Sequence, residues 1–333
     1  HPRQFQEKYK ELQPERYADD VAKILDSGKT PAGTHRPIMV REILEVLALR
    51  PGETAVDCTL GYGGHAQELL RAVQPGGRLL GVDADPFELP KTEARMCALG
   101  FPAESLVVRR MNYAGVAQFL AMEATAGADA LLADLGLSSM QIDDPSRGFS
   151  FKVDGPLDMR MNPHRGPSAA EFLAKCAVDD LAQILSDNAD EPESERIAAR
   201  IVAARGRAPL TTTRGLADVI RSACAVASDI TDDEADATIR RVFQAIRIHI
   251  NDEFGALETF LRQLPVCLKP GGRVAILSFH SGEDRRVKAA FKAGFADGLY
   301  QSIAKDIVRP STEEQRANPR SASAKLRFAV RSL

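Results

Sequence analysis

Two patterns of apolar residues divide the chain. Short continuous apolar runs, each closed by turn formers, occur between residues 54 and 133 and again towards the C-terminus. Such runs predict strands of a parallel sheet that is covered on both faces. Between these two regions, apolar residues recur at helical spacing. The expected strands are 54–58, 79–82, 105–108, 130–133, 273–278 and, antiparallel, 325–330.

This order of segments predicts an α/β fold with an inserted helical domain. We expect the sheet domain to comprise residues 35–140 and 239–333, with the helical insert, residues 141–238, between the fourth and fifth strands. Residues 1–34 are polar and charge-balanced, and we expect a helical extension of one or two short amphipathic helices there.

The first strand leads into a glycine turn, residues 60–64, and then a helix, residues 65–73. Strand, glycine turn and helix form the first unit of a nucleotide-binding sheet. Glycines let the backbone approach a ligand closely, and the helix N-terminus offers free N–H groups to an anion. The spacing G-x-G-G-H differs from the G-x-G-x-x-G of dinucleotide sites.

Asp83 closes the second strand twenty residues after Gly63. A carboxylate at this place suits the hydroxyl pair of a ribose, in NAD or in S-adenosylmethionine equally. Asp85 is the alternative, unless it caps the following helix. The sequence therefore predicts an adenosine cofactor and favours Asp83 as its ribose ligand.

The stretch Ala130–Met161 combines a buried strand with a long polar loop. The strand stops at Asp134, and open α/β sheets bind ligands at the carboxyl ends of their strands. A loop of over twenty residues inside a compact domain is usually functional or disordered. The apolar residues interleaved in it, such as Phe149 and Leu157, argue against disorder.

Charge and cysteine content narrow the class of protein. The formal net charge of −3 does not indicate nucleic-acid binding, but residues 285–333 carry eleven Lys and Arg against four Asp and Glu. This segment is either a phosphate-binding surface or a solvated charged tail. The five scattered cysteines predict reduced thiols and a cytoplasmic protein. We expect no metal site, and no apolar run is long enough for a membrane span.

The string DLGLSSMQIDDPSRGFSFKVDGPLDMRM, residues 134–161, resembles the signature of the bacterial small-subunit rRNA cytosine-N4 methyltransferases, the MraW or RsmH family. The resemblance runs from His35 to Arg331 and departs from the family pattern at positions 187–194, 282 and 322. It implies a class I S-adenosylmethionine-dependent methyltransferase fold, with a mostly parallel seven-stranded sheet. Similar motifs are HRPIMVREILEVLAL, FQAIRIHINDE, SFHSGEDR and RPSTEEQRANPRSASAKLR.

The resemblance implies S-adenosyl-L-methionine as cofactor and a cytosine in the decoding region of 16S rRNA, within the small ribosomal subunit, as substrate. It leaves a homodimer open. The implied cofactor residues are Gly63, Gly64, His65, Asp83, Tyr113, Asp134 and Gln141. The expected RNA contacts are Arg160, Arg320, Lys325 and Arg327.

Methylation of an exocyclic amine needs positioning and a proton acceptor. The lone pair of that nitrogen is delocalised into the ring, so positioning, worth roughly 7–11 kcal/mol, must be joined by a group that polarises the N–H. Asp134 is the first candidate acceptor, with Asp158, His280 and Ser138 as alternatives.

Arg247 and Asn251 lie four residues apart, on one face of a predicted long helix. They either line the cleft or hold the insert to the sheet.

Three other functions compete with rRNA methylation. The first is methylation of another amine, in DNA or a small molecule. The second is a non-catalytic RNA-binding or ribosome-assembly factor, which would not need Asp83 and Asp134. The third, a nicotinamide dehydrogenase, lacks the third-glycine spacing.

Overall fold

The computed structural model describes residues 37–225 and 231–333. The extension expected at residues 1–34 lies outside these ranges. The described chain forms two compact units. One combines the residues up to Gly136 with Gly255–Leu333, and the other comprises Leu137–Phe254. Among the described helices, none has the length and apolarity that a bilayer crossing requires.

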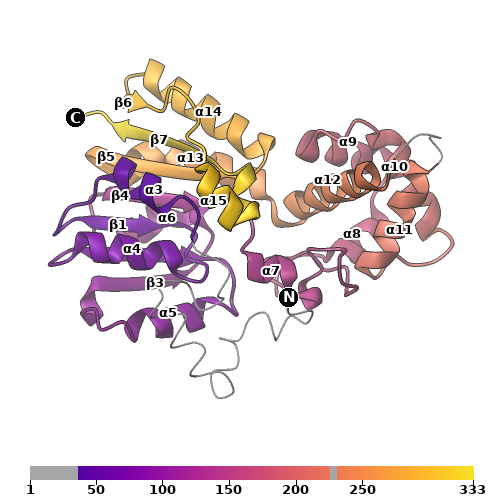
Figure 1. The fold of residues 1–333 in the computed structure, drawn as a ribbon, viewed down its shortest axis with the longest axis horizontal. Helices are drawn as coiled ribbons and strands as arrows, with labels where there is room; N and C mark the ends of the chain where they lie inside the picture. Colours follow the sequence, from indigo (N-terminus) through magenta and orange to yellow (C-terminus); the bar gives the residue numbers. More distant parts are fainter. Residues whose placement is uncertain (1–36, 226–230) are drawn as a thin grey trace. The chain divides into compact units, whose positions relative to one another are not determined.

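A seven-stranded sheet forms the centre of the first unit (Figure 1). Its strand order is β3-β2-β1-β4-β5-β7-β6, and only the two pairings that β7 makes are antiparallel. The expected mostly parallel seven-stranded fold is therefore confirmed. The strands are β1 Thr54–Asp57, β2 Arg78–Asp83, β3 Leu106–Arg110, β4 Ala128–Asp134, β5 Leu268–Ser278, β6 Tyr300–Ile303 and β7 Lys325–Arg331.

Strand β6 was not among the expected strands. Its four residues form no apolar run, because Gln301 and Ser302 in its centre are polar. Both side chains are exposed. Pairing with β7 at the edge of the sheet makes the segment a strand.

Helices cover both faces of this sheet, because successive strand residues point to opposite sides. Ala55, Leu79 and Leu132 pack against α3, α4 and α5, while Val56, Leu80 and Leu131 pack against α6, α13 and α14. The helices are α3 Val40–Leu47, α4 Gly64–Val73, α5 Leu89–Cys97, α6 Val116–Met122, α13 Glu253–Cys267, α14 Ser281–Ala296 and α15 Thr312–Ala317.

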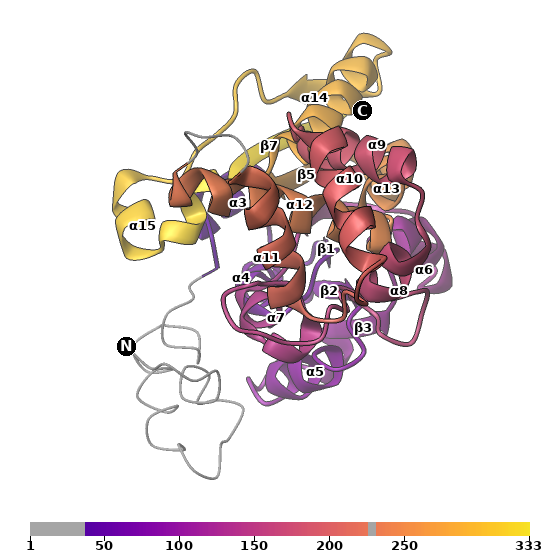
Figure 2. The same cartoon turned by 90° about the vertical axis from the view of Figure 1, so that its right-hand side faces the viewer.

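The second unit is helical and has a core of its own (Figure 2). Val242, Ala245 and Ile246 on α12 are buried in that core. The compact unit therefore ends at Phe254, beyond the residue 238 at which we expected the insert to end. Its helices are α7 Ser139–Asp143, α8 Ala169–Lys175, α9 Val178–Ala189, α10 Ser194–Arg205, α11 Thr213–Cys224 and α12 Asp232–Asn251.

Candidate active site

Three adjacent strands of the sheet each end in an aspartate. Asp83 closes β2, Asp57 closes β1 and Asp134 closes β4, and these strands are neighbours in that order. Because the strands are parallel, the three carboxylates lie together at the carboxyl ends of the strands. This end of the sheet is called the sheet edge below. Carboxylates grouped in this way repel one another and favour a cationic ligand.

Asp83 organises the glycine turn opposite it. Its Oδ2 accepts a hydrogen bond from the backbone N–H of Gly61 at 2.7 Å, and its Oδ1 accepts one from Asp85 at 2.8 Å. Burial raises the pKa of Asp83, the two N–H groups oppose this, and the charges of Asp85 and Glu88 add to it. Each carboxylate oxygen keeps lone-pair capacity for a ribose hydroxyl.

Asp85 serves as a cap instead. The side chain is 2 % exposed, and its Oδ1 accepts from the N–H groups of Phe87 and Glu88 at 2.8 and 3.2 Å. These bonds hold the turn that leads into α5. The geometry therefore agrees with Asp83, rather than Asp85, as the ribose candidate.

The glycine turn is tightly packed against its surroundings. Gly63 has φ +88°, and a Cβ there would lie 3.0 Å from Thr92 Cγ2. A Cβ on Gly64 would lie 2.5 Å from Pro37 Cγ. The threonine hydroxyl also donates to the Gly61 carbonyl at 2.6 Å. A larger residue at either glycine would displace the turn. The close packing therefore fixes the backbone conformation that leads into the N-terminus of α4.

His65, in the first turn of α4, faces Asp134. Its Nε2 lies 3.5 Å from Asp134 Oδ2, which is longer than a well-formed hydrogen bond, so the contact is chiefly electrostatic. The Asp134 backbone N–H donates to Thr59 Oγ1 at 2.7 Å, and the Thr59 N–H donates to Asp57 Oδ1 at 3.0 Å. Thr59 thus joins the ends of β1 and β4, a role that sequence reasoning missed.

The buried ionisable groups of this edge have shifted pKa values. Burial raises the pKa of Asp57 to about 6, although the hydrogen bond from Thr59 opposes the shift. Burial alone lowers the pKa of the His65 imidazole, but contact with Asp134 and the charges of Asp134, Asp57 and Glu314 raise it overall. Groups with such shifts cluster at functional sites.

Tyr113 follows the third strand along this edge. It begins a short 3₁₀ helix, Tyr113–Gly115, after β3, which pairs with the strand of Asp83. Its ring packs edge-on against Phe260, with centroids 5.4 Å apart, and remains partly exposed. The expected adenine-contacting aromatic therefore lies beside the ribose candidate.

His280 lies at the same edge, as the N-cap of α14 after β5. Its Nε2 is 3.2 Å from Glu283 Oε1, and Glu283 Oε2 accepts the N–H of Phe279 at 2.9 Å. The imidazole is thereby oriented by a carboxylate that is 3 % exposed. His280 stays a candidate, but it is held by Glu283 in this structure.

Three of the expected RNA contacts are in the sheet unit. Two of them lie near the sheet edge, and the third forms a buried ion pair. Lys325 pairs with Ser278 at the end of β5, and Arg320 lies half-buried in the 3₁₀ helix Pro319–Ser323. Arg327 is different. Its buried guanidinium donates to both carboxylate oxygens of Asp284, at 2.7 and 3.2 Å. This side chain fastens β7 to α14, and its RNA role stays a prediction.

The remaining predicted residues belong to the helical unit. Gln141 forms a capping box with Ser138 at the start of α7. Asp158 receives a two-pronged contact from Arg160, at 2.9 and 2.6 Å. Burial tends to raise the pKa of Asp158, but the hydrogen bonds and charge of Arg160 lower it overall. A carboxylate held in this way is a weak proton acceptor. The cofactor role of Gln141 and the RNA role of Arg160 stay predictions.

The signature loop, residues 134–161, is anchored in the helical unit by Asn251. Its amide donates to the Met159 carbonyl at 2.8 Å, and its Oδ1 accepts the Met161 N–H at 2.7 Å. Arg247 instead pairs with Glu253, at 2.7 and 2.9 Å. In this unit, Asn251 therefore fixes the loop to α12, an outcome outside the two roles considered from sequence.

A family model described as the MraW methylase family matches residues 32–332. The chain belongs to this family. Ribosomal RNA small subunit methyltransferase H 2 of Alkaliphilus metalliredigens is 49 % identical over 334 aligned residues, covering 100 % of this chain and 95 % of that protein. Ribosomal RNA small subunit methyltransferase H 1 of Lachnoclostridium phytofermentans is 48 % identical, covering 100 % and 91 %. The protein of the same name from Agathobacter rectalis is 45 % identical, covering 100 % and 95 %.

The family resemblance expected from the motifs is thus confirmed. The alignments also correct its extent. Motif similarity was expected to start at His35, yet these three relatives align with the whole chain, including residues 1–34. The extension is therefore matched in these relatives.

The residues at the sheet edge fit the cofactor of this methylase family. Among buried polar atoms in the described ranges, Asp57 Oδ2 and Asp134 Oδ1 have no hydrogen-bond partner. With Asp83 they place negative charge where the sulfonium and ammonium groups of S-adenosylmethionine would be stabilised. The pyrophosphate of a dinucleotide would be repelled by the same groups.

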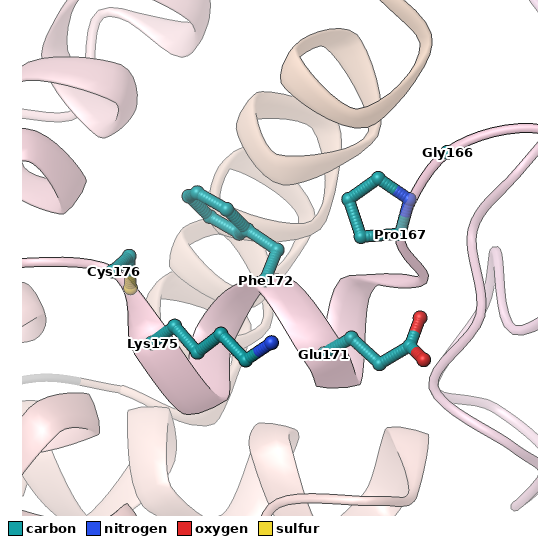
Figure 3. A pocket seen from close by; sticks show the side chains of 6 residues that line it. All are labelled: Gly166, Pro167, Glu171, Phe172, Lys175 and Cys176. Atoms are coloured by element: carbon teal, nitrogen blue, oxygen red, sulfur yellow. The ribbon is translucent and has the colours of Figure 1, made fainter.

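A separate open hollow of about 510 Å³ lies on the helical unit, along α8. Figure 3 shows Glu171 and Lys175 on its wall, with Phe172 directed towards α12, where the ring contacts His249 at 4.5 Å between centroids. Glu171 is already used, because its carboxylate accepts the Ser168 N–H in the capping box of α8. This hollow therefore lacks the arrangement of groups that the sheet edge provides.

Proposed function

We propose that this protein transfers a methyl group from S-adenosylmethionine to the exocyclic N4 of a cytidine in the decoding region of small-subunit rRNA. The observation that carries the proposal is the row of aspartates on three adjacent strand ends, beside the glycine turn, in a chain of the MraW methylase family. The names of the relatives, rRNA small subunit methyltransferase H, support the substrate.

Each part of the edge has a separate task in this proposal. S-adenosylmethionine supplies the methyl group as a sulfonium. Asp83 binds the ribose hydroxyls, Tyr113 contacts the adenine, and the N–H groups at the start of α4 bind the methionine carboxylate. Asp134 accepts a hydrogen bond from the cytosine N4 and polarises it during attack.

The substrate must present an unstacked base to reach a site of this kind. RNA is usually read at exposed loops, and the chain has a local basic segment despite its net charge of −3. We propose that Lys325 and Arg320 contact rRNA phosphates near the sheet edge, and that Arg160 does so from the helical unit. We place the reaction in the cytoplasm, on small ribosomal subunits.

The test is transfer of labelled methyl groups to small subunits that lack the modification, followed by mapping of the labelled nucleotide. Wild type should label N4 of one decoding-region cytosine, and Asp134→Asn should lower the rate by about 10²- to 10⁴-fold, the range of general acid–base contributions. Glu45→Gln, an exposed acid on α3, is the matched control and should behave as wild type.

Free rRNA, DNA and small amines assayed in parallel separate the competing functions. Label on DNA or a small amine, with none on subunits, would replace the proposed substrate. Binding of S-adenosylmethionine and of subunits without any transfer would favour a non-catalytic assembly factor.

A further inference from the structure

Three buried polar atoms without a hydrogen-bond partner, within the described ranges, lie on side chains grouped at the sheet edge. They are Asp57 Oδ2, His65 Nε2 and Asp134 Oδ1, from the end of β1, the first turn of α4 and the end of β4. Nearly all buried polar atoms in native proteins are hydrogen-bonded. Three exceptions on interacting ionisable groups therefore need a reason, and proton transfer requires groups of this kind.

The imidazole of His65 lies among carboxylates from three different elements. Asp134 on β4 is 3.5 Å away, and the charges of Asp57 on β1 and Glu314 on α15 also act on it. Glu314 is held in place, since its Oε1 accepts the Met39 N–H at 2.7 Å. Asp57 also interacts with the charge of Asp83. This surrounding stabilises a positive charge on His65.

We propose that Asp134 and His65 form a two-step proton relay for methyl transfer, with Asp57 as a positioning residue that stabilises the His65 imidazolium. The inference rests on the proposed function and names its proton acceptor. The contact between Asp134 and His65 and the bridge through Thr59 to Asp57 supply the geometry.

As the bond from N4 to the methyl carbon forms and the sulfur–carbon bond breaks, N4 gives one proton to the Asp134 carboxylate. Asp134 then passes this proton to Nε2 of neutral His65 and becomes ionised again. The imidazolium releases it to solvent before the next turnover. The products are S-adenosylhomocysteine, N4-methylcytosine and one proton.

The first test is the pH dependence of kcat, because a merely structural histidine would not set it. In wild type, kcat should rise with pH to a plateau as His65 becomes neutral. His65→Gln should lower the plateau by about 10²-fold, the lower end of general-base effects, and remove the inflection. The Kd for S-adenosylmethionine should change by less than about threefold. His164→Gln, on the exposed part of the helical unit, should leave the profile unchanged.

A second variant keeps the inference falsifiable if His65→Gln fails to fold. Asp57→Asn removes one negative charge facing His65, so the inflection should move to lower pH. An unchanged inflection in Asp57→Asn, or a wild-type profile in His65→Gln, would overturn the relay.

The third test needs no RNA. Nuclear magnetic resonance titration of the His65 ring in the whole protein should show its pKa falling in Asp134→Asn. If it does not move, the relay is wrong even if rRNA is methylated. If the pKa of His65 falls but no rRNA is methylated, the proposed substrate is wrong, while the coupling between Asp134 and His65 is supported.

Discussion

At the scale of single residues, three aspartates in equivalent strand positions have different environments. Asp57 is buried with one oxygen bonded to Thr59, Asp83 accepts the backbone N–H groups of two turns, and Asp134 faces His65. In our proposals the same residue type therefore serves as charge stabiliser, ligand and acceptor, and its neighbours decide which.

We expect Asp83→Asn to weaken S-adenosylmethionine binding by about 10- to 100-fold. A hydrogen bond to a charged group is worth about 1.5–3 kcal/mol, and each 1.4 kcal/mol is about tenfold in Kd. Isothermal titration calorimetry measures the effect, with Glu45→Gln as control. Unchanged binding by Asp83→Asn would remove this residue from the cofactor set.

At the scale of elements, the signature loop is folded on itself as well as anchored by Asn251. Arg147 donates to the Met161 carbonyl at 2.8 Å, and Phe149, Leu157 and Met159 are buried in the helical core. The left-handed turn at Gly148 lies directly against the backbone of Pro156 and Asp158 in the same loop.

Substitutions at two glycines of this region allow the cost of backbone strain to be measured apart from the cost of a steric clash. Both have positive φ, +73° at Gly148 and +74° at Gly166, but only a Cβ at Gly148 meets backbone, 2.3 Å from the Pro156 carbonyl oxygen. Gly166→Ala should cost about 1–2 kcal/mol of unfolding free energy, the cost of a left-handed residue. Gly148→Ala should cost at least about 3 kcal/mol. Urea denaturation compares them, and equal losses would contradict this packing.

Arg327 and Lys325 on β7 should have opposite phenotypes. Arg327→Met leaves the carboxylate of Asp284 without its partner, so we expect a loss of about 2–4 kcal/mol in unfolding free energy. Lys325→Met should unfold within about 0.5 kcal/mol of wild type and weaken RNA binding at all sequences, with a smaller salt dependence. Thermal unfolding measures the stability of each variant, and titration with RNA measures its binding. An Arg327→Met variant that is as stable as wild type but fails to bind RNA would instead support Arg327 as an RNA contact.

At the scale of the whole molecule, the two units have separate cores, and the ionisable groups with raised pKa values described at the sheet edge are part of the sheet unit. For Asp57 and Asp83, burial opposes folding when the carboxylate is charged. The site that binds a cation therefore reduces the stability of the protein that carries it, a common relation between function and stability.

The unfolding free energy of the cofactor-free protein should fall as pH rises from about 4 to 6. The native state holds the Asp57 proton up to a pKa of about 6, while the unfolded chain loses it near 3.8, so raising the pH favours unfolding. His65, whose pKa is also raised, acts in the same direction.

Asp57→Asn should flatten this dependence and gain up to about 3 kcal/mol at pH 7, from a shift of about two pKa units at 1.36 kcal/mol each. Urea denaturation of both proteins across this range provides the measurement. A variant that is less stable than wild type at every pH would contradict the assignment.

The order of elements and the position of most site residues followed from local sequence. Continuous apolar runs predicted β1, β2, β4 and much of β5, because a strand covered on both faces must be apolar throughout. Parallel pairing then required the carboxyl ends of those strands to lie at the same end of the sheet, which predicted Asp83 and Asp134 at one site. The motifs were sufficient for the family.

Other features depended on contacts between distant parts of the chain. Strand β6 exists only through pairing with β7, and Arg327 is removed from the surface by Asp284, forty-three positions away in sequence. The link between Asp57, Thr59 and Asp134 likewise joins two strands that are distant in sequence. Residue type and spacing cannot predict such partners, because burial and charge depend on what the folded chain brings alongside.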